Sequence, residues 1–253
     1  MHWCLGMYGS ASTWTYSLVQ KIAAAIMPDR PVIPHFVVDS LADLDESAGT
    51  LVVKTHAASA AEELARRASA IIITIRDPRD AIASLMAHNK APFGLALEVT
   101  EATAFICGRF AAHDRAILLR FEDQFYDDPM TIEKIAATFH GELSDYDRDR
   151  IFSETRRGAI EVFITKLETL PTAESDYDEL TGQQDTYDQL TGWHKHHAGR
   201  KGEIGRWQHE LSPFQVAAIE ERLRPWMESF GYQPRTPRPP LYVLSIGRYE
   251  ISR

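Results

Sequence analysis

Cysteine is scarce in this sequence, and long apolar runs are missing from it. The 253 residues include two cysteines, Cys4 and Cys107, each inside an apolar stretch. Two cysteines cannot build a disulfide framework, so we expect both to be small core residues in a reducing compartment. No run approaches the roughly 20 apolar residues of a membrane-spanning helix, and the first residues lack the features of a secretory signal. The sequence therefore predicts a soluble, cytoplasmic protein.

An excess of positive charge is also missing. Lys and Arg number 27 against 36 for Asp and Glu, a formal net charge of -9. This balance disfavours general binding to nucleic acid or to a membrane surface, although a local basic site is compatible with it. It also mildly disfavours anionic polysaccharides, so a small molecule is the expected partner. The composition is that of an ordinary globular protein, and the length suits one α/β domain over residues 1–253.

Short β-branched runs alternate with longer amphipathic stretches over the first two thirds of the chain. Strands are expected at 3–7, 32–38, 51–54, 70–75 and 116–121, with helices at 12–26, 58–68, from 78 onward, 95–114, 131–139, 156–170 and 212–230. This alternation is typical of a mostly parallel sheet flanked by helices. Pro34 weakens the second strand, because proline removes a ladder donor. Asp77 as N-cap and Pro78 as first helical residue form a strong helix start.

The composition changes after Pro171. Residues 172–192 are polar and acidic, and the pattern Tyr-Asp-x-Leu-Thr-Gly occurs in them twice, starting at Tyr177 and at Tyr187. Two copies are too few for a repeat fold, so we expect an exposed acidic loop. Its aspartates could in principle hold a cation, but nothing in the sequence shows them converging. Residues 233–253 are expected to form a C-terminal extension with a strand at 241–246.

The first segment with chemical character is the turn after the first predicted strand. Small residues at 9–13 lie between a strand and a helix, where backbone N–H groups and the positive helix end can hold an anion. Ser10, Ser12 and Thr13 add hydroxyl donors, and Trp14 offers a ring on which a base can stack. The Gly-Lys-Ser/Thr ending of a nucleotide-kinase loop is absent. Taken alone, such a turn is also a common packing solution.

The second segment is Lys54-Thr-His56, at the end of a predicted strand. Ligands of open parallel sheets bind beyond the carboxyl ends of the strands. A lysine there can neutralise an anion, and a histidine can act as a general base near neutral pH. The alternative is an exposed lysine beside a hydrogen-bonded histidine.

The third segment joins Arg76, which follows the strand at 70–75, to Ser84 in the second turn of the next helix. A guanidinium and a hydroxyl can bind one phosphate together. The alternative is a salt bridge from Arg76 to Asp80 or Asp123.

The fourth segment is Gly-Arg-Lys-Gly at 199–202. Arg200 and Lys201, between Gly199 and Gly202, can cover an anion, and such a flexible basic segment is a candidate lid. The alternative is a solvated basic loop. Three histidines lie just upstream, namely His194, His196 and His197. Their spacing and the lack of an obvious fourth ligand argue against a metal site.

In order and in spacing, these segments resemble the sulfotransferase family that uses 3'-phosphoadenosine-5'-phosphosulfate (PAPS). The resemblance covers about residues 3–232. Ser10–Trp14 resembles the family's 5'-phosphosulfate loop, and Lys54-Thr-His56 resembles its Lys-Thr-His motif. Arg76 and Ser84 match its 3'-phosphate pair. Two later segments complete the match: Arg120-Phe-Glu-Asp123 resembles an Arg-Tyr-Glu-Asp segment, and Arg200-Lys-Gly202 with Gly205 and Trp207 resembles the Arg-Lys-Gly motif at the 3'-phosphate.

The resemblance implies a P-loop-like α/β fold and transfer of a sulfuryl group from PAPS to a hydroxyl or amine, with 3'-phosphoadenosine-5'-phosphate (PAP) as product and no metal. His56 would be the catalytic base and Lys54 would stabilise the leaving phosphate. The nucleotide would be bound by Gly9, Ser10, Ala11, Ser12, Thr13, Trp14, Arg76, Ser84, Phe121, Arg200, Lys201 and Gly202. Residues 92–110 and 153–192 are expected to shape the acceptor pocket, and Ser153 and Thr155 are secondary candidates for the adenine.

Two departures from the family pattern concern charge. Gly9 stands where the family has Lys or Arg, and Arg206 replaces the aspartate before the Trp. Losing one such electrostatic contact can lower a rate by roughly 10²–10³. A third departure, Ala11 for Gly, is harmless if the residue keeps an ordinary L-residue conformation. Two alternatives therefore stay open: a PAPS- or PAP-binding protein with little or no activity, and a nucleotide-dependent kinase of P-loop type.

Overall fold

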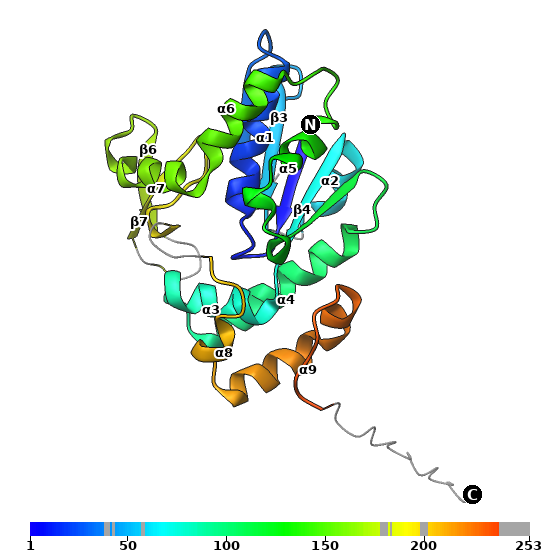
Figure 1. Cartoon of the computed structure of the whole chain (residues 1–253), viewed down its shortest axis with the longest axis vertical. Helices are drawn as coiled ribbons and strands as arrows, with labels where there is room; N and C mark the ends of the chain where they lie inside the picture. Colours follow the sequence, from blue (N-terminus) through cyan, green and yellow to red (C-terminus); the bar gives the residue numbers. More distant parts are fainter. Residues whose placement is uncertain are drawn as a thin grey trace, which may run out of the picture.

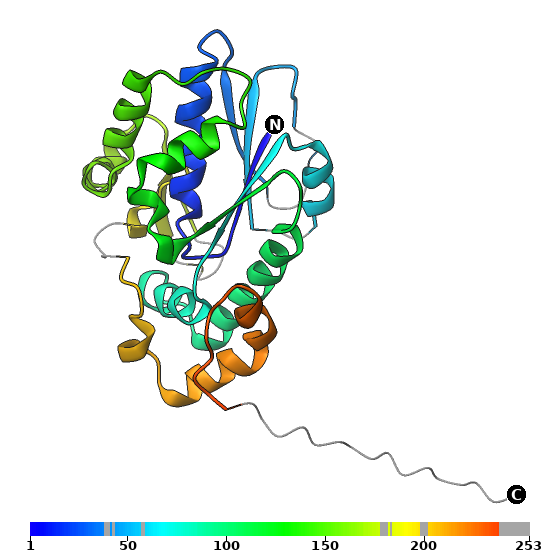
Figure 2. The same ribbon diagram turned by 45° about the vertical axis from the view of Figure 1, so that its right-hand side comes forward.

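The computed structural model describes residues 1–37, 41, 44–56, 59–177, 182, 184–197 and 202–237. The predicted strand at 241–246 lies outside these residues, as do Arg200 and Lys201. A five-stranded sheet forms the centre of the described part, and helices flank it (Figures 1 and 2). The expectation of a mostly parallel α/β architecture is confirmed.

The central sheet consists of parallel strands in the order β2-β3-β1-β4-β5. These strands are β1 (His2–Gly6), β2 (Val32–Phe36), β3 (Thr50–Thr55), β4 (Ala70–Ile75) and β5 (Ala116–Arg120). The chain builds the sheet first on one side of β1 and then on the other. Ligands of such sheets bind where the order reverses, beyond the carboxyl ends of the strands. Pro34 is tolerated because β2 lies at the edge.

Helices cover both faces of the sheet. One face packs against α1 (Ser12–Ile26), α5 (Pro129–Ala136) and α6 (Asp145–Thr155). The other packs against α2 (Ala61–Arg67), α3 (Pro78–His88), α4 (Phe93–Phe110) and α9 (Pro213–Ser229). The remaining helices are α7 (Arg157–Thr165), α8 (Trp207–Glu210) and the 3-10 turns Phe121–Asp123, Phe125–Asp127, Leu167–Thr169 and Lys195–His197. Within the described residues, no helix combines the length and the apolar character of a membrane span.

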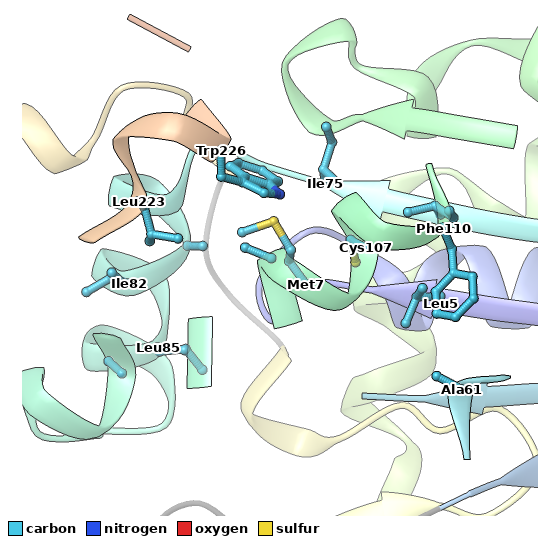
Figure 3. Packing of buried hydrophobic residues seen from close by; sticks show 14 of the residues in the cluster. Leu5, Met7, Ala61, Ile75, Ile82, Leu85, Cys107, Phe110, Leu223 and Trp226 are labelled. Atoms are coloured by element: carbon cyan, nitrogen blue, oxygen red, sulfur yellow. The ribbon is translucent and has the colours of Figure 1, made fainter. Parts of the chain in front are cut away.

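Alternate residues of each strand enter two different apolar cores. Trp3 of β1 belongs to the core shared with α3, α4 and α9, whereas Cys4 belongs to the core shared with α1 and α5. In the first core, Met7 lies near Cys107 of α4 and Trp226 of α9 (Figure 3). Both cysteines are buried and free, and burial raises the pKa of the Cys4 thiol to about 12. They are small core residues, as expected.

Two segments differ from the sequence prediction. Residues 172–192, expected to be an exposed loop, contain the antiparallel pair β6 (Ala173–Tyr177) and β7 (Gln184–Asp188). The hairpin escaped prediction because its residues are mostly polar and show no clear apolar alternation. Helix α6 was also missed, since only Ile151 and Thr155 of its residues are buried.

Candidate active site

A cavity of about 830 Å³ opens beyond the carboxyl ends of β1, β3 and β4. This volume is in the range of small-molecule sites. Most of the site residues predicted from the sequence line it, namely Gly9, Ala11, Ser12, Thr13, Trp14, Lys54, His56, Arg76, Ser84, Phe121 and Gly202. Arg200 and Lys201 lie outside the described residues. The structure thus brings residues of the first three segments, Phe121, and Gly202 of the fourth segment to one cavity.

Ser10 is the exception among the residues of the turn. Its hydroxyl donates to the Met7 carbonyl at 2.6 Å and lies 2.8 Å from the Thr74 hydroxyl of β4. The side chain is fully buried and does not line the cavity. Contrary to expectation, this hydroxyl holds the turn against β4 and is not available to a ligand. Ser12 and Thr13 do face the cavity, at the end of α1 where the first N–H groups lack intrahelical acceptors.

Ala11 precedes α1 in a left-handed conformation, with φ 67° and ψ 30°. The condition under which alanine would be a harmless replacement for glycine at this position is therefore not met. The cause is the turn itself, which reverses the chain between β1 and α1 within a few residues. A left-handed conformation costs a residue with a Cβ roughly 1–2 kcal/mol, whereas glycine adopts it freely.

Replacing Ala11 by glycine is expected to raise the free energy of unfolding by about 0.5–1 kcal/mol, because the strain at this position disappears. Urea denaturation measures the change. The matched control is Ala24→Gly on the exposed side of α1, which is expected to lower stability by a similar amount. A loss of stability in both variants would show that position 11 is not strained.

Lys54 is a buried cation at the carboxyl end of β3. Its side chain is 6% exposed, and Nζ donates to Thr13 Oγ1 at 2.7 Å. Among the described residues, no carboxylate forms an ion pair with it. Burial lowers the pKa of Lys54 to about 8. The structure thus places an ammonium group without a counter-charge beside the start of α1.

His56 lies next to this lysine and has a defined tautomer. Nδ1 lies 2.8 Å from the Gly6 carbonyl, which can only accept, so Nδ1 carries the proton. The ring stacks on Tyr8 with centroids 4.2 Å apart. Burial and the charge of Lys54 lower the pKa of His56 to about 3. The imidazole is therefore neutral near pH 7, and its Nε2 lone pair can accept a proton from a bound substrate.

Arg76 is the second buried cation, on the other side of β1. It donates to the carbonyls of Gly9 at 3.0 Å and Glu203 at 2.8 Å, and the side chain is 3% exposed. The salt bridge to Asp80 exists but is long, at 3.8 Å. Its Nε has no hydrogen-bond partner among the described residues. Burial lowers the pKa of Arg76, while Asp80 opposes this effect. An anion in the cavity would satisfy both the charge and the free donor.

Gly9 lies close to both Arg76 and Ser84. Its carbonyl accepts from Arg76, and a Cβ at this position would lie 3.4 Å from the Cβ of Ser84. Its φ of 69° is left-handed, a conformation that glycine adopts without strain. Arg76 and Ser84, the two side chains predicted to bind a phosphate, therefore both lie against the turn that contains Gly9.

The segment that starts at Gly202 is attached to the beginning of α3. Asp80 accepts the N–H groups of Gly205 at 2.6 Å and Trp207 at 3.0 Å. Burial raises the pKa of Asp80, although these N–H groups oppose it. Gly202 lies close to the Phe121 ring, since a Cβ there would be 3.2 Å from it. Gly202, the described end of the fourth predicted segment, thus lies at the cavity beside Phe121.

Two aromatic side chains predicted to hold a base also lie in the cavity. The Arg76 guanidinium lies over the Phe121 ring, 4.1 Å from its centroid. Trp14 Nε1 donates to the Thr155 carbonyl at 2.9 Å. Thr155 lines the cavity too, whereas Ser153 is exposed and does not.

Arg206 lines the cavity at the position where the family pattern has aspartate. Its side chain is 7% exposed and pairs with Glu210 at 2.6 Å. The charge of Arg206 is one of the influences that lower the pKa of Arg76, and both side chains line the cavity. This departure adds a cation to the site.

A cluster of histidines around Asp185 forms another part of the wall. His194 and His196 each donate from Nδ1 to Oδ2 of Asp185 at 2.7 Å. His197 packs against His196 with ring centroids 4.5 Å apart. Although burial raises the pKa of Asp185, the two hydrogen bonds outweigh it and hold the pKa below its ordinary value. Sequence reasoning missed Asp185, because no local signal tells which aspartate of residues 172–192 turns toward the histidines.

Apolar and aromatic side chains form a further part of the wall. Ile160 and Ile164 of α7 contribute to it, as do Tyr187 and Leu190 of the hairpin region. Residues within 153–192 thus line the cavity, and that they shape an acceptor pocket stays a prediction. The prediction for 92–110 does not agree with the structure, because α4 packs against α3 and α9 beneath the sheet and does not line the cavity.

Comparison with known proteins identifies the fold. No protein-family model and no curated protein matches the chain. Among solved structures, mouse sulfotransferase SULT7A1 complexed with PAP is similar with a TM-score of 0.56 and 13% identity, over 90% of this chain and 84% of that chain. Retinol dehydratase with androsterone and the inactive cofactor PAP, and with retinol and PAP, gives TM-scores of 0.59 at 15% identity, over 93% of this chain. The chain has the sulfotransferase fold.

Proposed function

We propose that this protein transfers a sulfuryl group from PAPS to a hydroxyl or amine of a small-molecule acceptor. One observation carries the proposal: two buried cations, Lys54 and Arg76, line one cavity on opposite sides of the turn after β1. A nucleotide with charged groups at both its 3' and 5' positions matches this arrangement. The presence of PAP in the similar structures supports the same ligand.

The charged groups of the cavity divide between the two ends of such a nucleotide. The 3'-phosphate would be bound by Arg76 and Ser84, with Arg206 and Gly202 also lining the cavity. The 5'-phosphosulfate would lie against the N-terminus of α1, where Lys54 and the first N–H groups are available. Trp14 and Phe121 would hold the adenine between these ends.

His56 would act as the general base of the transfer. Its Nε2 takes the proton of the acceptor as the acceptor oxygen or nitrogen attacks sulfur. The bond from sulfur to the 5'-phosphate oxygen breaks, and PAP leaves with the electron pair. Lys54 and the start of α1 stabilise the charge on that phosphate. Because Lys54 donates to Thr13 within the turn itself, it can supply the cation that Gly9 does not.

Labelled PAPS with a panel of phenols, alcohols and amines tests the proposal. Sulfated product is the expected result. Tight binding of PAP without transfer to any acceptor would favour a non-catalytic nucleotide-binding protein, the alternative that Gly9 supports. Magnesium-dependent turnover of ATP would favour a kinase, against which the absent Gly-Lys-Ser/Thr ending argues.

The rate is expected to fall above about pH 8, because Lys54 loses its proton there and with it the charge that stabilises the leaving phosphate. No loss is expected between pH 8 and pH 5, since His56 with a pKa of about 3 stays unprotonated. The dependence of kcat/KM on pH measures both the fall above pH 8, which is the alkaline limb, and the constant rate between pH 8 and pH 5. In Lys54→Arg the alkaline limb should disappear, because arginine keeps its charge. An unchanged limb in that variant would assign it to another group.

A lysine introduced at position 9 is expected to raise turnover by restoring a cation to the turn. Gly9→Lys is expected to lower the free energy of unfolding by about 1 kcal/mol, because the left-handed φ of 69° strains any residue with a Cβ. Initial rates at saturating PAPS, compared with Gly9→Ala, separate the charge from the strain. Loss of nucleotide binding in the lysine variant alone would show that this position does not face the phosphosulfate.

A further inference from the structure

The cluster of Asp185, His194 and His196 has no role in the transfer proposed above. One potential ligand atom from each of these residues lies within 4.8 Å of the other two. All three side chains are partly buried and line the cavity. The cluster therefore offers two imidazole nitrogens and one carboxylate oxygen around a single point.

The backbone holds this arrangement in place. Asp185 is part of β7, which pairs with β6. His194 is held beside the same strand by a bridge to Tyr187, and their rings stack with centroids 5.3 Å apart. The His194 N–H also donates to His197 Nδ1 at 3.2 Å. The three potential ligands thus come from one small folded unit.

We propose that Asp185, His194 and His196 bind one divalent transition-metal ion of the zinc class at the wall of the cavity. Two imidazoles and one carboxylate are a ligand set that suits zinc. On binding, each imidazole would adopt the tautomer with its proton on Nε2, so that the Nδ1 lone pair faces the ion in place of the hydrogen bond to the carboxylate. Ligand atoms of a tetrahedral zinc site lie about 3.3 Å apart, so the present 2.7 Å separations need to open by about 0.6 Å.

Three protein ligands leave one position of a tetrahedral ion free. Zinc sites with a free position typically hold water or a substrate oxygen, whereas structural sites use four protein ligands. Because all three residues line the cavity, a small molecule bound there can reach this position. The sequence argument against a metal rested on the spacing of the histidines and on the lack of an obvious fourth ligand, whereas the structure places the Asp185 carboxylate beside two of the three histidines. This inference does not depend on PAPS or on sulfuryl transfer.

Titration of the metal-stripped full-length protein with Zn²⁺, followed by calorimetry, tests the site without any nucleotide. One equivalent is expected to bind. Asp185→Asn and His196→Ala should each weaken binding by more than about 100-fold, since each removes a direct ligand. The controls are His140→Ala and His209→Ala, which remove exposed histidines elsewhere and should leave the affinity unchanged. Absence of binding by the unmodified protein, or equal losses in the controls, would overturn the proposal.

If the alanine and asparagine variants fail to fold, a variant with another metal-ligating side chain at position 196 still tests the site. His196→Cys replaces one zinc ligand by another, so it should retain one equivalent of metal. With Co²⁺ as the probe, this variant should gain a thiolate-to-metal absorption band that the unmodified protein lacks. Binding of Co²⁺ without this band would show that residue 196 does not ligate the ion and would contradict the site.

Discussion

Replacing His56 by alanine is expected to lower the rate of sulfuryl transfer by about 10³-fold, because the acceptor proton then has no positioned base. The affinity for PAP should change by no more than about twofold, since no charge of the nucleotide site is removed. Single-turnover transfer from labelled PAPS measures the first quantity, and calorimetry with PAP measures the second. The structural reason is the tautomer: Nδ1 is held by the Gly6 carbonyl, which leaves Nε2 unprotonated in the cavity.

The matched control for this prediction is His209→Ala on α8, which removes an exposed histidine. It should leave both quantities unchanged. An undiminished rate in His56→Ala would contradict the mechanism and would direct attention to the histidines around Asp185, which line the same cavity.

Replacing Arg76 by methionine is expected to weaken PAP binding by about 100-fold, the loss of a charge-assisted interaction worth about 2–3 kcal/mol. Binding of adenosine 5'-monophosphate, which lacks the 3'-phosphate, should weaken by less than about threefold. Calorimetry with the two nucleotides measures this difference in selectivity. The expectation rests on a guanidinium that is 3% exposed, lines the cavity and has no hydrogen-bond partner for its Nε within the described part of the chain.

Arg76 also donates to the carbonyls of Gly9 and Glu203, so a purely structural effect has to be separated. Arg76→Lys keeps the charge without the planar fork and should retain part of the selectivity for PAP. Arg66→Met on the exposed side of α2 is the control for removing an arginine. Equal losses for both nucleotides in the Arg76 variants would mean that this residue only shapes the turn.

Local signals in the sequence were sufficient for much of the fold. Ser12–Ile26 forms α1 as its amphipathic pattern predicts, and the continuous apolar run at 70–75 forms β4. Asp77 caps α3 by accepting the Arg79 N–H at 2.9 Å. These elements were predictable because burial and capping leave a pattern within a few neighbouring residues.

Elements without such a pattern were not predictable. Helix α6 (Asp145–Thr155) is so polar that its apolar stripe is weak, although Ser144 accepts the Asp147 N–H as a cap. The hairpin of β6 and β7 is mostly polar as well. Both elements form because of tertiary packing, and the local periodicity of a sequence does not predict tertiary packing.

The candidate site was predictable to the level of segments. Lys54, His56, Arg76 and Ser84 lie at or shortly after the ends of strands whose carboxyl ends meet in a parallel sheet, so their convergence follows from topology. The orientation of individual groups did not follow. Whether the Ser10 hydroxyl faces a ligand or β4 depends on contacts between residues far apart in the sequence, and so does the position of Asp185.

The affinity of the unmodified protein for PAP, relative to adenosine 5'-monophosphate and to ATP with magnesium, tests the central claim most directly. Two buried cations on either side of one turn predict that PAP binds at least about 100-fold more tightly than either competitor. Equal binding of PAP and adenosine 5'-monophosphate, or a preference for ATP with magnesium, would contradict a cavity built for a doubly phosphorylated adenosine.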